Sequence, residues 1–388
     1  MLPSKQLVRR IILQQPEKCP LGKRVTFLHY RLDTGGIDRV ACLLASGFAE
    51  AEYQVDLVVF CDQGSAEANL LPLLSKKVNL HYLGHSGGSR TRDLIRLSHR
   101  CIDWARKNRP DYLVSTSNNM NAVTAIIAKM SGSPSKVILK TTNPVVRKKD
   151  RRIYAAFRKF GYVMAIDLAD KVLTLSDAET KLLQRQFPAF KSKFSTVINP
   201  YVTPDMLRDP AKQIAVGNRK LVLGIGRFEP QKRFDLLIKA FASLKREDVN
   251  LVILGEGQQK QECEALVKKL HLSHQVQMPG FSVNIASWLH QADLLVMTSR
   301  YEGLPAVVLE ALAANCPVLT TDCFPAAKEM LEPLDGCELI KDAVPNQIAQ
   351  QMAAMLAFPR TTNLRPVAKR YAIQNGIDDH IKQVVAQI

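Results

Sequence analysis

The amino-acid sequence lacks the features that identify several classes of protein. Its eight cysteines form no Cys-x-x-Cys pair and have no histidines at metal-binding spacing, so we expect free thiols in a reducing cytosol. No segment approaches the roughly 18 consecutive apolar residues of a membrane-spanning helix. The short apolar stretch 7–13 is interrupted by Arg9 and Arg10, which argues against a signal peptide. Any contact with a membrane is therefore expected to be peripheral.

With 46% hydrophobic and 23% charged residues, the composition is typical of a globular protein, and 388 residues suffice for about two domains. The formal net charge of +17 is unevenly distributed. Residues 1–205 hold 32 basic and 17 acidic side chains, whereas residues 206–388 hold 21 and 19. The basic half suits nucleic acid, an anionic membrane surface or an anionic substrate; alternatively, the charge only keeps the protein in solution.

Short apolar runs alternate with amphipathic segments along the whole chain. In the first half, strands are predicted at 25–30, 55–60, 78–83, 112–117, 136–141 and 171–176, with helices at 36–50, 91–108, 119–131, 152–168 and 177–187. In the second half, strands are predicted at 220–226, 249–255, 276–281, 293–299 and 316–321, with helices at 231–245, 258–271, 305–314 and 344–357. Apolar strands separated by helices indicate α/β domains with doubly wound parallel sheets.

A cluster of prolines between 200 and 210 marks the boundary between two such domains. The predicted division is an N-terminal extension at 1–24, a first domain at 25–205 and a second domain at 206–365. A last helical pattern at 366–385 has no strand after it, and we expect residues 366–388 to pack back on the first domain. Because ligands bind outside the carboxyl ends of parallel strands, two facing domains would form one deep central cleft.

Two cations follow the first strand of the second domain. The strand ends in Gly224-Ile-Gly226, and Arg227 and Lys232 come next. Glycine lets the backbone approach a ligand, while a guanidinium, an ammonium and a helix N-terminus all favour anions. The segment suits a diphosphate. The alternative is an ordinary loop arginine and a solvated helix lysine.

Two glutamates follow a later strand of the same domain. Glu302 begins a turn that ends at Pro305, and the helix that follows has first-turn amides able to hold a phosphate. Glu310 lies about 1.5 turns into that helix, where a carboxylate can accept hydrogen bonds from ribose hydroxyls. The alternatives are support of the helix dipole by Glu302 and a surface charge at Glu310.

Arg227 and Lys232, with Glu302 and Glu310 at Glu-x7-Glu spacing, resemble the signature of the family 4 retaining glycosyltransferases, which have the GT-B fold of two Rossmann-like domains. The segments ADKVLTLSDAET (169–180), LVILGEG (251–257), ADLLVMTSRYEGLPAVVLEALA (292–313) and CPVLTTD (316–322) occur in the usual order of the family. The segment 33–40 resembles its glycine loop. The resemblance implies a UDP- or GDP-linked sugar as donor, retention of anomeric configuration, and no metal or other cofactor; the chain has no Asp-x-Asp motif.

The resemblance also implies roles for individual residues. Arg227 and Lys232 would neutralise the donor diphosphate and Glu302 would touch the transferred sugar, so these three are the expected catalytic residues. Glu310 would bind the ribose, and the leaving phosphate would take the proton of the acceptor. The other expected donor-binding residues are Gly35, Gly36, Gly280, Phe281, Gly303, Leu304, Pro305, Ala306 and Val307.

The first-domain loops depart from the family pattern. Where many relatives carry histidine or acidic residues, this chain has Ser-Asn-Asn-Met-Asn at 117–121 and Thr-Thr-Asn-Pro at 141–144. Amides can position sugar hydroxyls but cannot act as a base at neutral pH. Asn118, Asn119 and Asn143 are therefore candidate acceptor-binding residues, although they could instead cap the following helix. His29 could face the cleft or have a structural role.

A basic run precedes aromatic residues at helical spacing. Core packing explains part of the aromatic stripe, and an amphipathic basic helix that lies on anionic lipid is the alternative. The candidate membrane-contacting residues are Arg147, Lys148, Lys149, Arg151 and Arg152.

The sequence therefore predicts a metal-independent, retaining glycosyltransferase at the cytoplasmic face of a bacterial membrane. Its expected acceptor is a lipid-linked saccharide in exopolysaccharide, capsule or lipopolysaccharide assembly. No nucleic acid is expected as a partner. The alternatives are another enzyme on sugar nucleotides, such as an epimerase, and a basic nucleic-acid-binding protein. Against an epimerase, the sequence has no evident set of carboxylate and histidine residues for epimerisation. Against a nucleic-acid-binding protein, it lacks the basic strands with interleaved aromatic residues that are typical of common RNA-binding modules.

Overall fold

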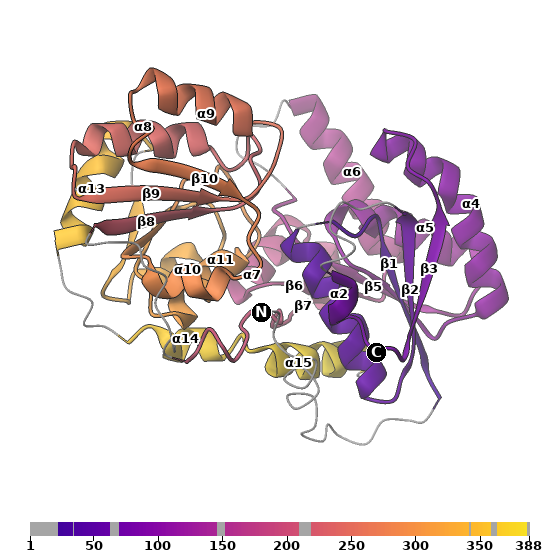
Figure 1. Cartoon of the computed structure of the whole chain (residues 1–388). Helices are drawn as coiled ribbons and strands as arrows, with labels where there is room; N and C mark the ends of the chain where they lie inside the picture. Colours follow the sequence, from indigo (N-terminus) through magenta and orange to yellow (C-terminus); the bar gives the residue numbers. More distant parts are fainter. Residues whose placement is uncertain are drawn as a thin grey trace. The chain divides into compact units, whose positions relative to one another are not determined.

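The computed structural model describes residues 22–33, 35–62, 70–145, 152–208, 219–340, 343–357 and 363–385 (Figure 1). The chain forms two compact units: unit 1 comprises Met1–Pro200 and Ile373–Ile388, and unit 2 comprises Tyr201–Ala372. The change of unit thus comes before the boundary expected at 205. Residues 366–372, which were expected to pack back on the first domain, belong to unit 2.

Unit 1 is built on a parallel sheet of seven strands in the order β3-β2-β1-β4-β5-β6-β7. The strands are β1 (Arg24–His29), β2 (Gln54–Cys61), β3 (Val78–Gly84), β4 (Tyr112–Ser115), β5 (Lys136–Lys140), β6 (Lys171–Thr174) and β7 (Phe194–Thr196). The α-helices are α2 (Gly36–Glu50), α4 (Arg90–Asn108), α5 (Asn118–Ser131), α6 (Arg152–Leu168), α7 (Asp177–Gln186) and α15 (Ile373–Val385). Strand β2 buries every residue after Gln54, as expected for a sheet covered on both faces.

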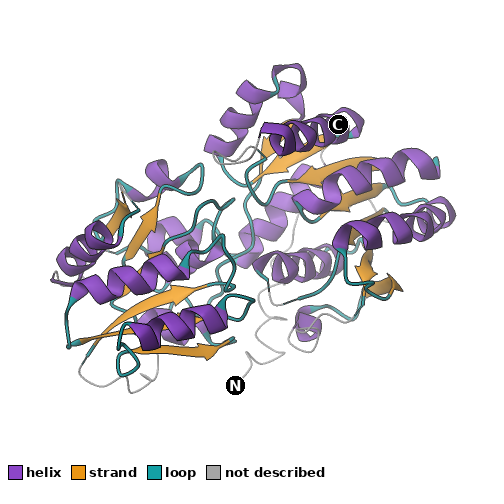
Figure 2. Ribbon diagram, turned by 90° about the horizontal axis from the view of Figure 1, so that it is seen from above, coloured by secondary structure: helices purple, strands orange, loops and turns teal. Residues whose placement is uncertain are grey.

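Helices cover both faces of this sheet (Figure 2). The chain moves outward from β1 to β3 and then returns to β4, so right-handed connections place α2 on one face and α4, α5 and α6 on the other. Helix α5 contacts both α4 and α6. Helix α15 contacts α2, although the two helices come from opposite ends of the chain (Figure 1).

The packing of α15 on unit 1 depends on a close approach and a buried polar contact. A Cβ atom at Gly47 of α2 would lie 2.5 Å from Cγ2 of Ile377, so a side chain there would force the two helices apart. Helix α15 also supplies His380, whose buried Nε2 lies 2.8 Å from Nζ of Lys140 at the end of β5. Helix α15 is therefore an integral part of unit 1.

Unit 2 is built on a parallel sheet of six strands in the order β10-β9-β8-β11-β12-β13. The strands are β8 (Lys220–Ile225), β9 (Val249–Leu254), β10 (Val276–Gly280), β11 (Leu294–Met297), β12 (Val318–Thr321) and β13 (Cys337–Ile340). The helices are α8 (Phe234–Leu244), α9 (Lys260–Lys269), α10 (Ile285–Gln291), α11 (Ala306–Ala313), α12 (Ala327–Leu331), α13 (Pro345–Ala357) and α14 (Arg365–Lys369). Helices α8, α9 and α13 enclose one hydrophobic core against the sheet.

The sequence-based prediction of strands and helices was incomplete at the edges of both units. It missed β7 and β13, each of which is the last strand at one edge of its sheet. These strands have only 3 and 4 residues and include polar ones, so they lack the apolar run of a central strand. The single helix predicted at 366–385 is two helices, α14 and α15, separated by a turn at 370–372.

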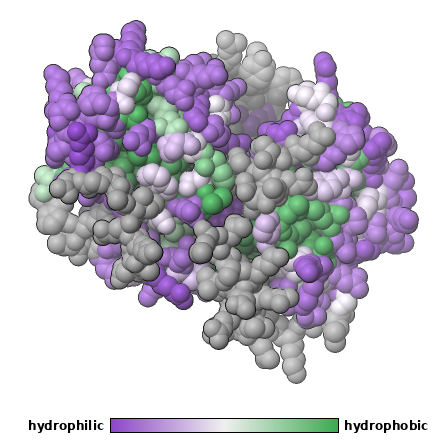
Figure 3. Space-filling model, viewed as in Figure 1, coloured by the Kyte–Doolittle hydropathy of each residue, from purple (hydrophilic) through white to green (hydrophobic). Residues whose placement is uncertain are grey.

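No helix in the described part of the chain is both long enough and apolar enough to cross a bilayer. In the space-filling view, hydrophilic residues cover most of the coloured surface, and hydrophobic residues show only in limited areas (Figure 3). Large apolar side chains that are exposed include Phe160 at 64% and Met164 at 42%, one turn apart on α6.

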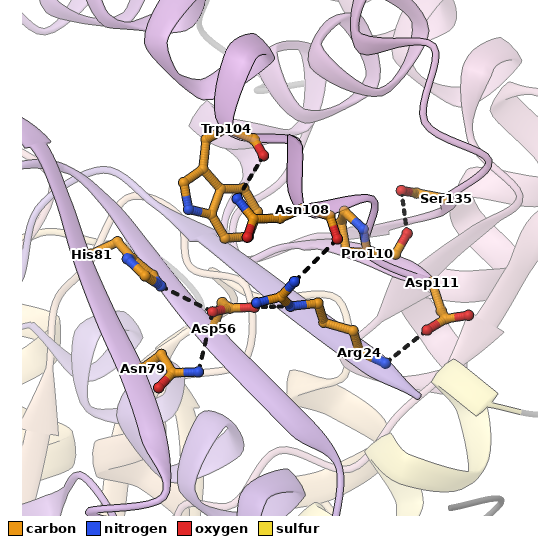
Figure 4. Close-up of polar contacts among 9 residues, drawn as sticks. All are labelled: Arg24, Asp56, Asn79, His81, Trp104, Asn108, Pro110, Asp111 and Ser135. Carbon is orange, nitrogen blue, oxygen red and sulfur yellow. Dashed lines mark hydrogen bonds and ion pairs between the residues drawn. The ribbon is translucent and has the colours of Figure 1, made fainter. Parts of the chain in front are cut away.

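A polar network closes the amino-terminal edge of the unit 1 sheet (Figure 4). Asp56, fully buried in β2, accepts hydrogen bonds from Nε of Arg24 at 2.7 Å and Nε2 of His81 at 2.9 Å. Nδ2 of Asn79 is 3.4 Å from the same carboxylate, and Arg24 also donates to the carbonyl of Asn108. Because both carboxylate oxygens have partners within the network, these side chains serve the fold. Ligands are expected at the opposite edge, where the strands end.

Candidate active site

The strand order of unit 2 reverses between β8 and β11, and the loops after these two strands, together with α11, hold most of the predicted catalytic and donor-binding residues. In a doubly wound sheet, the loops diverge at this point and leave a crevice outside the carboxyl ends of the strands. Arg227 and Lys232 follow β8, and Glu302 follows β11. The fold therefore brings Lys232 and Glu302, 70 positions apart in the sequence, to one place.

Lys232 and Glu302 form an ion pair in which Nζ lies 2.7 Å from Oε1. Only 19% of the lysine side chain and 10% of the glutamate side chain are exposed. An ammonium has three N–H donors, so Lys232 can hold Glu302 and still donate to another anion. The guanidinium of Arg227 is exposed, and it forms no ion pair with the residues that the structure describes. The loop thus holds one fixed and one exposed cation.

Backbone and side-chain contacts fix the position of Lys232. A Cβ atom at Gly226 would lie 2.9 Å from Cε of Lys232, so glycine lets the lysine cross the end of β8. The hydroxyl of Thr298 donates to the carbonyl of Lys232 at 3.0 Å, and the amide of Gln231 donates to the carbonyl of Tyr301 at 2.8 Å. The loops after β8 and β11 therefore hold each other in place.

The turn before α11 is buried throughout. Glu302, Gly303, Leu304 and Pro305 are all buried, and Pro305 is the residue that caps α11. The hydroxyl of Tyr201 donates to the carbonyl of Leu304 at 3.1 Å, which fixes the start of the helix. The amides of Ala306 and Val307 lie in the first turn, where amides have no intrahelical partner. The turn can therefore present these amides to a phosphate.

Glu310 is 6% exposed within α11, so the alternative of a surface charge is wrong. Its neighbours Leu309, Ala311 and Leu312 are buried as well. The apolar context in the sequence had indicated this burial. The carboxylate is held inside the unit, one turn from the start of α11.

Sequence reasoning missed several groups at this site. Ser299 follows β11, and its buried Oγ has no hydrogen-bond partner among the described residues. Its place at the carboxyl end of β11, where ligands bind, makes it a candidate ligand contact. Its place at the end of a predicted strand was the available signal. Burial, with the Glu302 carboxylate nearby, raises the pKa of Cys323 to about 12, so its thiol stays protonated.

The end of β10 brings a second ion pair close to Gly280 and Phe281, two of the predicted donor-binding residues. Gly280 has φ +95°, and a Cβ atom there would overlap the carboxylate of Glu256. That carboxylate pairs with Nζ of Lys260 at 2.8 Å. Phe281 follows Gly280 and is 43% exposed. Neither Glu256 nor Lys260 was singled out from the sequence, because only the pairing of β9 with β10 places them beside Gly280.

In unit 1, the predicted glycine loop is hydrogen-bonded to the first turn of α2. Oδ2 of Asp38 accepts from the amide of Gly35 at 3.0 Å, and Oδ1 lies 3.0 Å from Nε2 of His29. Nδ1 of His29 lies 2.7 Å from the hydroxyl of Thr116, just after β4. His29 therefore has the structural role that was one of its two alternatives. Gly36 is exposed and a Cβ there would meet nothing within 4 Å, so its backbone faces open space.

Asn118 joins the two loops that were assigned to the acceptor. Its Oδ1 accepts from the amides of Thr142 at 2.5 Å and Asn143 at 3.2 Å, and its Nδ2 donates to the carbonyl of Asn143 at 2.8 Å. Helix α5 begins at Asn118 itself, so the alternative of helix capping is wrong for this residue. Asn119 is exposed and Asn143 is half-buried. The acceptor-binding roles of these three asparagines stay predictions.

The predicted membrane-contacting residues 147–151 lie outside the described residues, and α6 begins at Arg152. In the described part of the chain, no group of three or more His, Cys, Asp or Glu side chains is arranged to hold a metal ion.

Two family models match the chain. One, described as Glycosyltransferase Family 4, matches residues 34–205, and the other, described as Glycosyl transferases group 1, matches residues 205–374. Among curated relatives, the N-acetylgalactosamine-N,N'-diacetylbacillosaminyl-diphospho-undecaprenol 4-alpha-N-acetylgalactosaminyltransferase of Campylobacter jejuni is 26% identical, over 84% of this chain and 88% of the relative. The amylovoran biosynthesis glycosyltransferase AmsD of Erwinia amylovora is 26% identical, over 77% of this chain and 81% of the relative.

Solved structures share the fold. Anabaena HepE in complex with UDP-glucose has a TM-score of 0.74 and 17% identity, and the match covers 94% of this chain and 100% of that one. WaaG, a glycosyltransferase involved in lipopolysaccharide biosynthesis, has a TM-score of 0.72 and 18% identity, with the same coverage. These likenesses confirm the expected GT-B fold.

Proposed function

The chain belongs to glycosyltransferase family 4, and from this membership we propose that it transfers a hexose, with retention of configuration, from a nucleotide-sugar to a saccharide carried on a membrane lipid. The relative from Campylobacter jejuni is named for an undecaprenol-diphosphate acceptor, and the relative from Erwinia amylovora for amylovoran biosynthesis. These names support an acceptor in bacterial polysaccharide or lipopolysaccharide assembly.

The ion pair of Lys232 with Glu302 is the observation that carries the donor half of the proposal. It lies where the strand order reverses, between the loops after β8 and β11, which is the usual place for a nucleotide in a doubly wound sheet. A fixed ammonium in a partly buried site stabilises charge that develops on a departing diphosphate. Arg227 can add a planar fork for the same phosphates.

The described part of unit 2 suits chemistry without a resident metal. Lys232, Arg227 and the first-turn amides of α11 together supply the positive charge that a divalent cation would otherwise bring to the diphosphate. The departing phosphate is then the base that takes the proton of the acceptor hydroxyl. We expect full turnover in the presence of excess EDTA.

The decisive experiment compares two lysines of unit 2, one at the end of the loop after β8 and one on α8. Lys232→Ala removes the fixed cation and should lower kcat by about 100-fold or more. Lys239→Ala, which removes an exposed lysine paired with Asp235 on α8, should leave kcat unchanged. Glu310→Gln should weaken donor binding, as expected for a ribose ligand. Equal transfer rates for Lys232→Ala and the wild type would reject the proposal.

Thermal-shift measurements with UDP, GDP and ADP would identify the donor, because a ligand that binds only the folded protein raises its apparent stability. One of the three is expected to stabilise the wild type and to lose its effect in Lys232→Ala. No stabilisation by any nucleoside diphosphate would contradict the donor assignment.

The proposal includes peripheral binding to the inner face of the cytoplasmic membrane. Phe160 and Met164 are exposed one turn apart on α6, and Lys159 lies beside them on the same helix. Met130, on the adjacent α5, is 60% exposed. Exposed apolar side chains next to basic ones suit an anionic lipid surface.

A further inference from the structure

Unit 1 has a second group of polar side chains, at the carboxyl ends of β1 and β3. Tyr30 follows β1, residues 85–89 follow β3, and α4 begins at Arg90. Tyr30 reaches this group across the end of β2, because its carbonyl accepts from the amide of Cys61, the last residue of β2, at 2.8 Å. His29, one residue earlier, bonds to Thr116 after β4, on the other side of β1. The group is therefore separate from the point where the strand order of unit 1 reverses.

Asp93 holds this group together. Its buried carboxylate accepts from the amide of Gly87 at 2.8 Å, the hydroxyl of Ser86 at 3.1 Å and the hydroxyl of Tyr30 at 3.2 Å. Burial by itself would raise the pKa of Asp93, but the hydrogen bonds from Gly87, Arg96, Ser86 and Tyr30 outweigh it and lower the pKa. The carboxylate therefore stays charged at neutral pH. Its bonds fix Tyr30 and the loop after β3 relative to each other.

Two guanidinium groups lie near the ring of Tyr30. The Cζ atom of Arg90 lies 5.2 Å from the ring centroid, and that of Arg31 lies 5.9 Å from it. Both cations are thus near the same ring. Arg96 donates to Asp93 at 3.2 Å and to the carbonyl of His85. Two arginines thus lie near the ring, and a third, Arg96, pairs with the buried carboxylate of Asp93, whose oxygens accept from four groups in all.

The pairing of these arginines leaves positive charge uncompensated. Arg31 is paired with Asp33 at 3.2 Å, but Arg90 has no carboxylate partner among the residues that the structure describes. At the far end of α4, by contrast, Arg106 pairs with Asp103 at 2.9 Å. An exposed, unpaired guanidinium that is held over an aromatic ring is ready to bind an anion, since its planar fork matches phosphate oxygens.

We propose that Arg90 and Arg31, which both lie near the ring of Tyr30, bind the diphosphate group of the lipid-linked acceptor. This inference rests on the proposed function, which gives a lipid-linked acceptor, and on the Campylobacter jejuni relative, whose name gives its acceptor a diphosphate. Two guanidiniums beside one ring suit a ligand with two adjacent anionic groups. The strand order of unit 1 reverses between β1 and β4, whereas this site lies at the ends of β1 and β3. A diphosphate bound here would therefore leave the crevice between β1 and β4 open to other parts of the ligands.

Geranyl diphosphate is a suitable probe because it carries a diphosphate on a short soluble lipid. Isothermal titration of the full chain should give an affinity that Arg90→Gln weakens by about tenfold or more, as expected from the loss of one charge-assisted contact. Arg92→Gln is the matched control. Arg92 lies two residues further along α4, which is about 200° around the helix, and it is exposed without a described partner. Its substitution should change the affinity less than twofold.

Three further arms identify the ligand. Geranyl monophosphate should bind more weakly than the diphosphate, and geraniol should not bind. Lys232→Ala should leave the affinity for geranyl diphosphate unchanged, which separates this site from the donor site. Arg90→Gln should also bind phosphatidylglycerol vesicles as the wild type does, which separates a diphosphate site from a surface for lipid headgroups.

The inference is overturned if Arg92→Gln weakens the binding of geranyl diphosphate as much as Arg90→Gln does. Binding would then depend only on the overall positive charge of unit 1. It is also overturned if Lys232→Ala abolishes the binding of geranyl diphosphate, or if Arg90→Gln impairs only vesicle binding. A failure of the proposed function is recognised separately, as a lack of stabilisation by nucleoside diphosphates and a lack of sugar transfer.

Discussion

At the scale of single residues, Gly226 and Lys232 show how the position of a cation can depend on the backbone beside it. The lysine chain crosses the end of β8 through space that a Cβ atom at Gly226 would occupy. Glu302 then fixes the ammonium at 2.7 Å. The lack of a side chain at Gly226 therefore determines where the positive charge of Lys232 lies.

We expect Gly226→Ala to lower kcat by at least about tenfold, because the new methyl group displaces Lys232 from its position. The substitution should cost only about 1 kcal/mol or somewhat more in the free energy of unfolding. Steady-state kinetics and urea unfolding check the two effects.

Gly161→Ala is the control for Gly226→Ala. Gly161 lies in α6, and a Cβ atom there would meet nothing within 4 Å. Alanine at a helix position should stabilise the protein by about 0.5–1 kcal/mol and leave kcat unchanged. If Gly226→Ala retained wild-type kcat, the position of Lys232 would not depend on this glycine.

The residues of the proposed donor site could be singled out from the sequence, but their contacts could not. Arg227, Lys232, Glu302 and Glu310 stand at fixed spacings after apolar strands, and that pattern is visible in one dimension. The contact of Glu256 with Gly280 exists only because β9 pairs with β10. The bonds from Asn118 to residues 142 and 143 likewise require β4 beside β5.

At the scale of elements, the same reasoning explains which strands were predicted. Central strands such as β2 and β8 are buried on both faces and therefore read as continuous apolar runs. The edge strands β7 and β13 have neighbours on one side only and carry polar residues, so no apolar run marks them. The turn between α14 and α15 was missed because no glycine or proline marks residues 370–372.

The docking of α15 on unit 1 involves a buried lysine that has no carboxylate partner among the described residues. Burial lowers the pKa of Lys140 from its ordinary 10.5 to about 7. Burial, together with Lys140, lowers the pKa of His380 well below its ordinary range. Nδ1 of His380 lies 2.7 Å from the carbonyl of Gly376, to which it donates, so Nε2 accepts from Lys140.

We expect the stability of unit 1 to rise with pH between about 7 and 10.5 because of Lys140. The folded state binds fewer protons than the unfolded state in that window, so its free energy of unfolding increases with pH. Below pH 7 the lysine is protonated in both states and contributes no further change. The slope from this one group is at most about 1.4 kcal/mol per pH unit.

Lys140→Met should abolish that slope and stabilise unit 1 at pH 7. Urea unfolding at pH 7, 8 and 9, followed by hydrogen exchange of the α15 amides, measures both effects. Lys136→Met is the control, since Lys136 lies on the same strand and is exposed, with Asp170 as its partner. An unchanged slope in Lys140→Met would show that Lys140 is not responsible for it.

At the scale of the whole molecule, the charge follows the two units. Unit 1 has 33 basic and 18 acidic residues, and unit 2 has 20 and 18. The excess positive charge therefore belongs almost entirely to the unit that would meet the acceptor and its membrane. The nearly neutral unit 2 uses single cations, Lys232 and Arg227, for its proposed ligand.

We expect the protein to sediment with vesicles of phosphatidylglycerol but not with those of phosphatidylcholine. Replacing both Phe160 and Met164 by serine should weaken this binding several-fold, because the two apolar side chains no longer enter the lipid surface. Charge reversal at Arg147, Lys148, Lys149, Arg151 and Arg152 should weaken it further.

Val283→Ser is the control for vesicle binding, since Val283 is an apolar residue of unit 2 with 57% exposure. It should bind as the wild type does. Duplex DNA, added as another polyanion, should not be a specific ligand. Equal binding to both kinds of vesicle, or binding to neither, would contradict peripheral membrane association.

The place of α15 also determines the order in which the units can be completed on the ribosome. The strands of unit 1 have all been synthesised by Thr196, but the helix that packs against Gly47 and covers Lys140 follows residue 372. Unit 2 is continuous in sequence, so it can finish folding while unit 1 still lacks one of its helices. A nascent chain therefore keeps an open face on its first unit until residues 373–385 have been synthesised, and a chain that terminates before them never closes it.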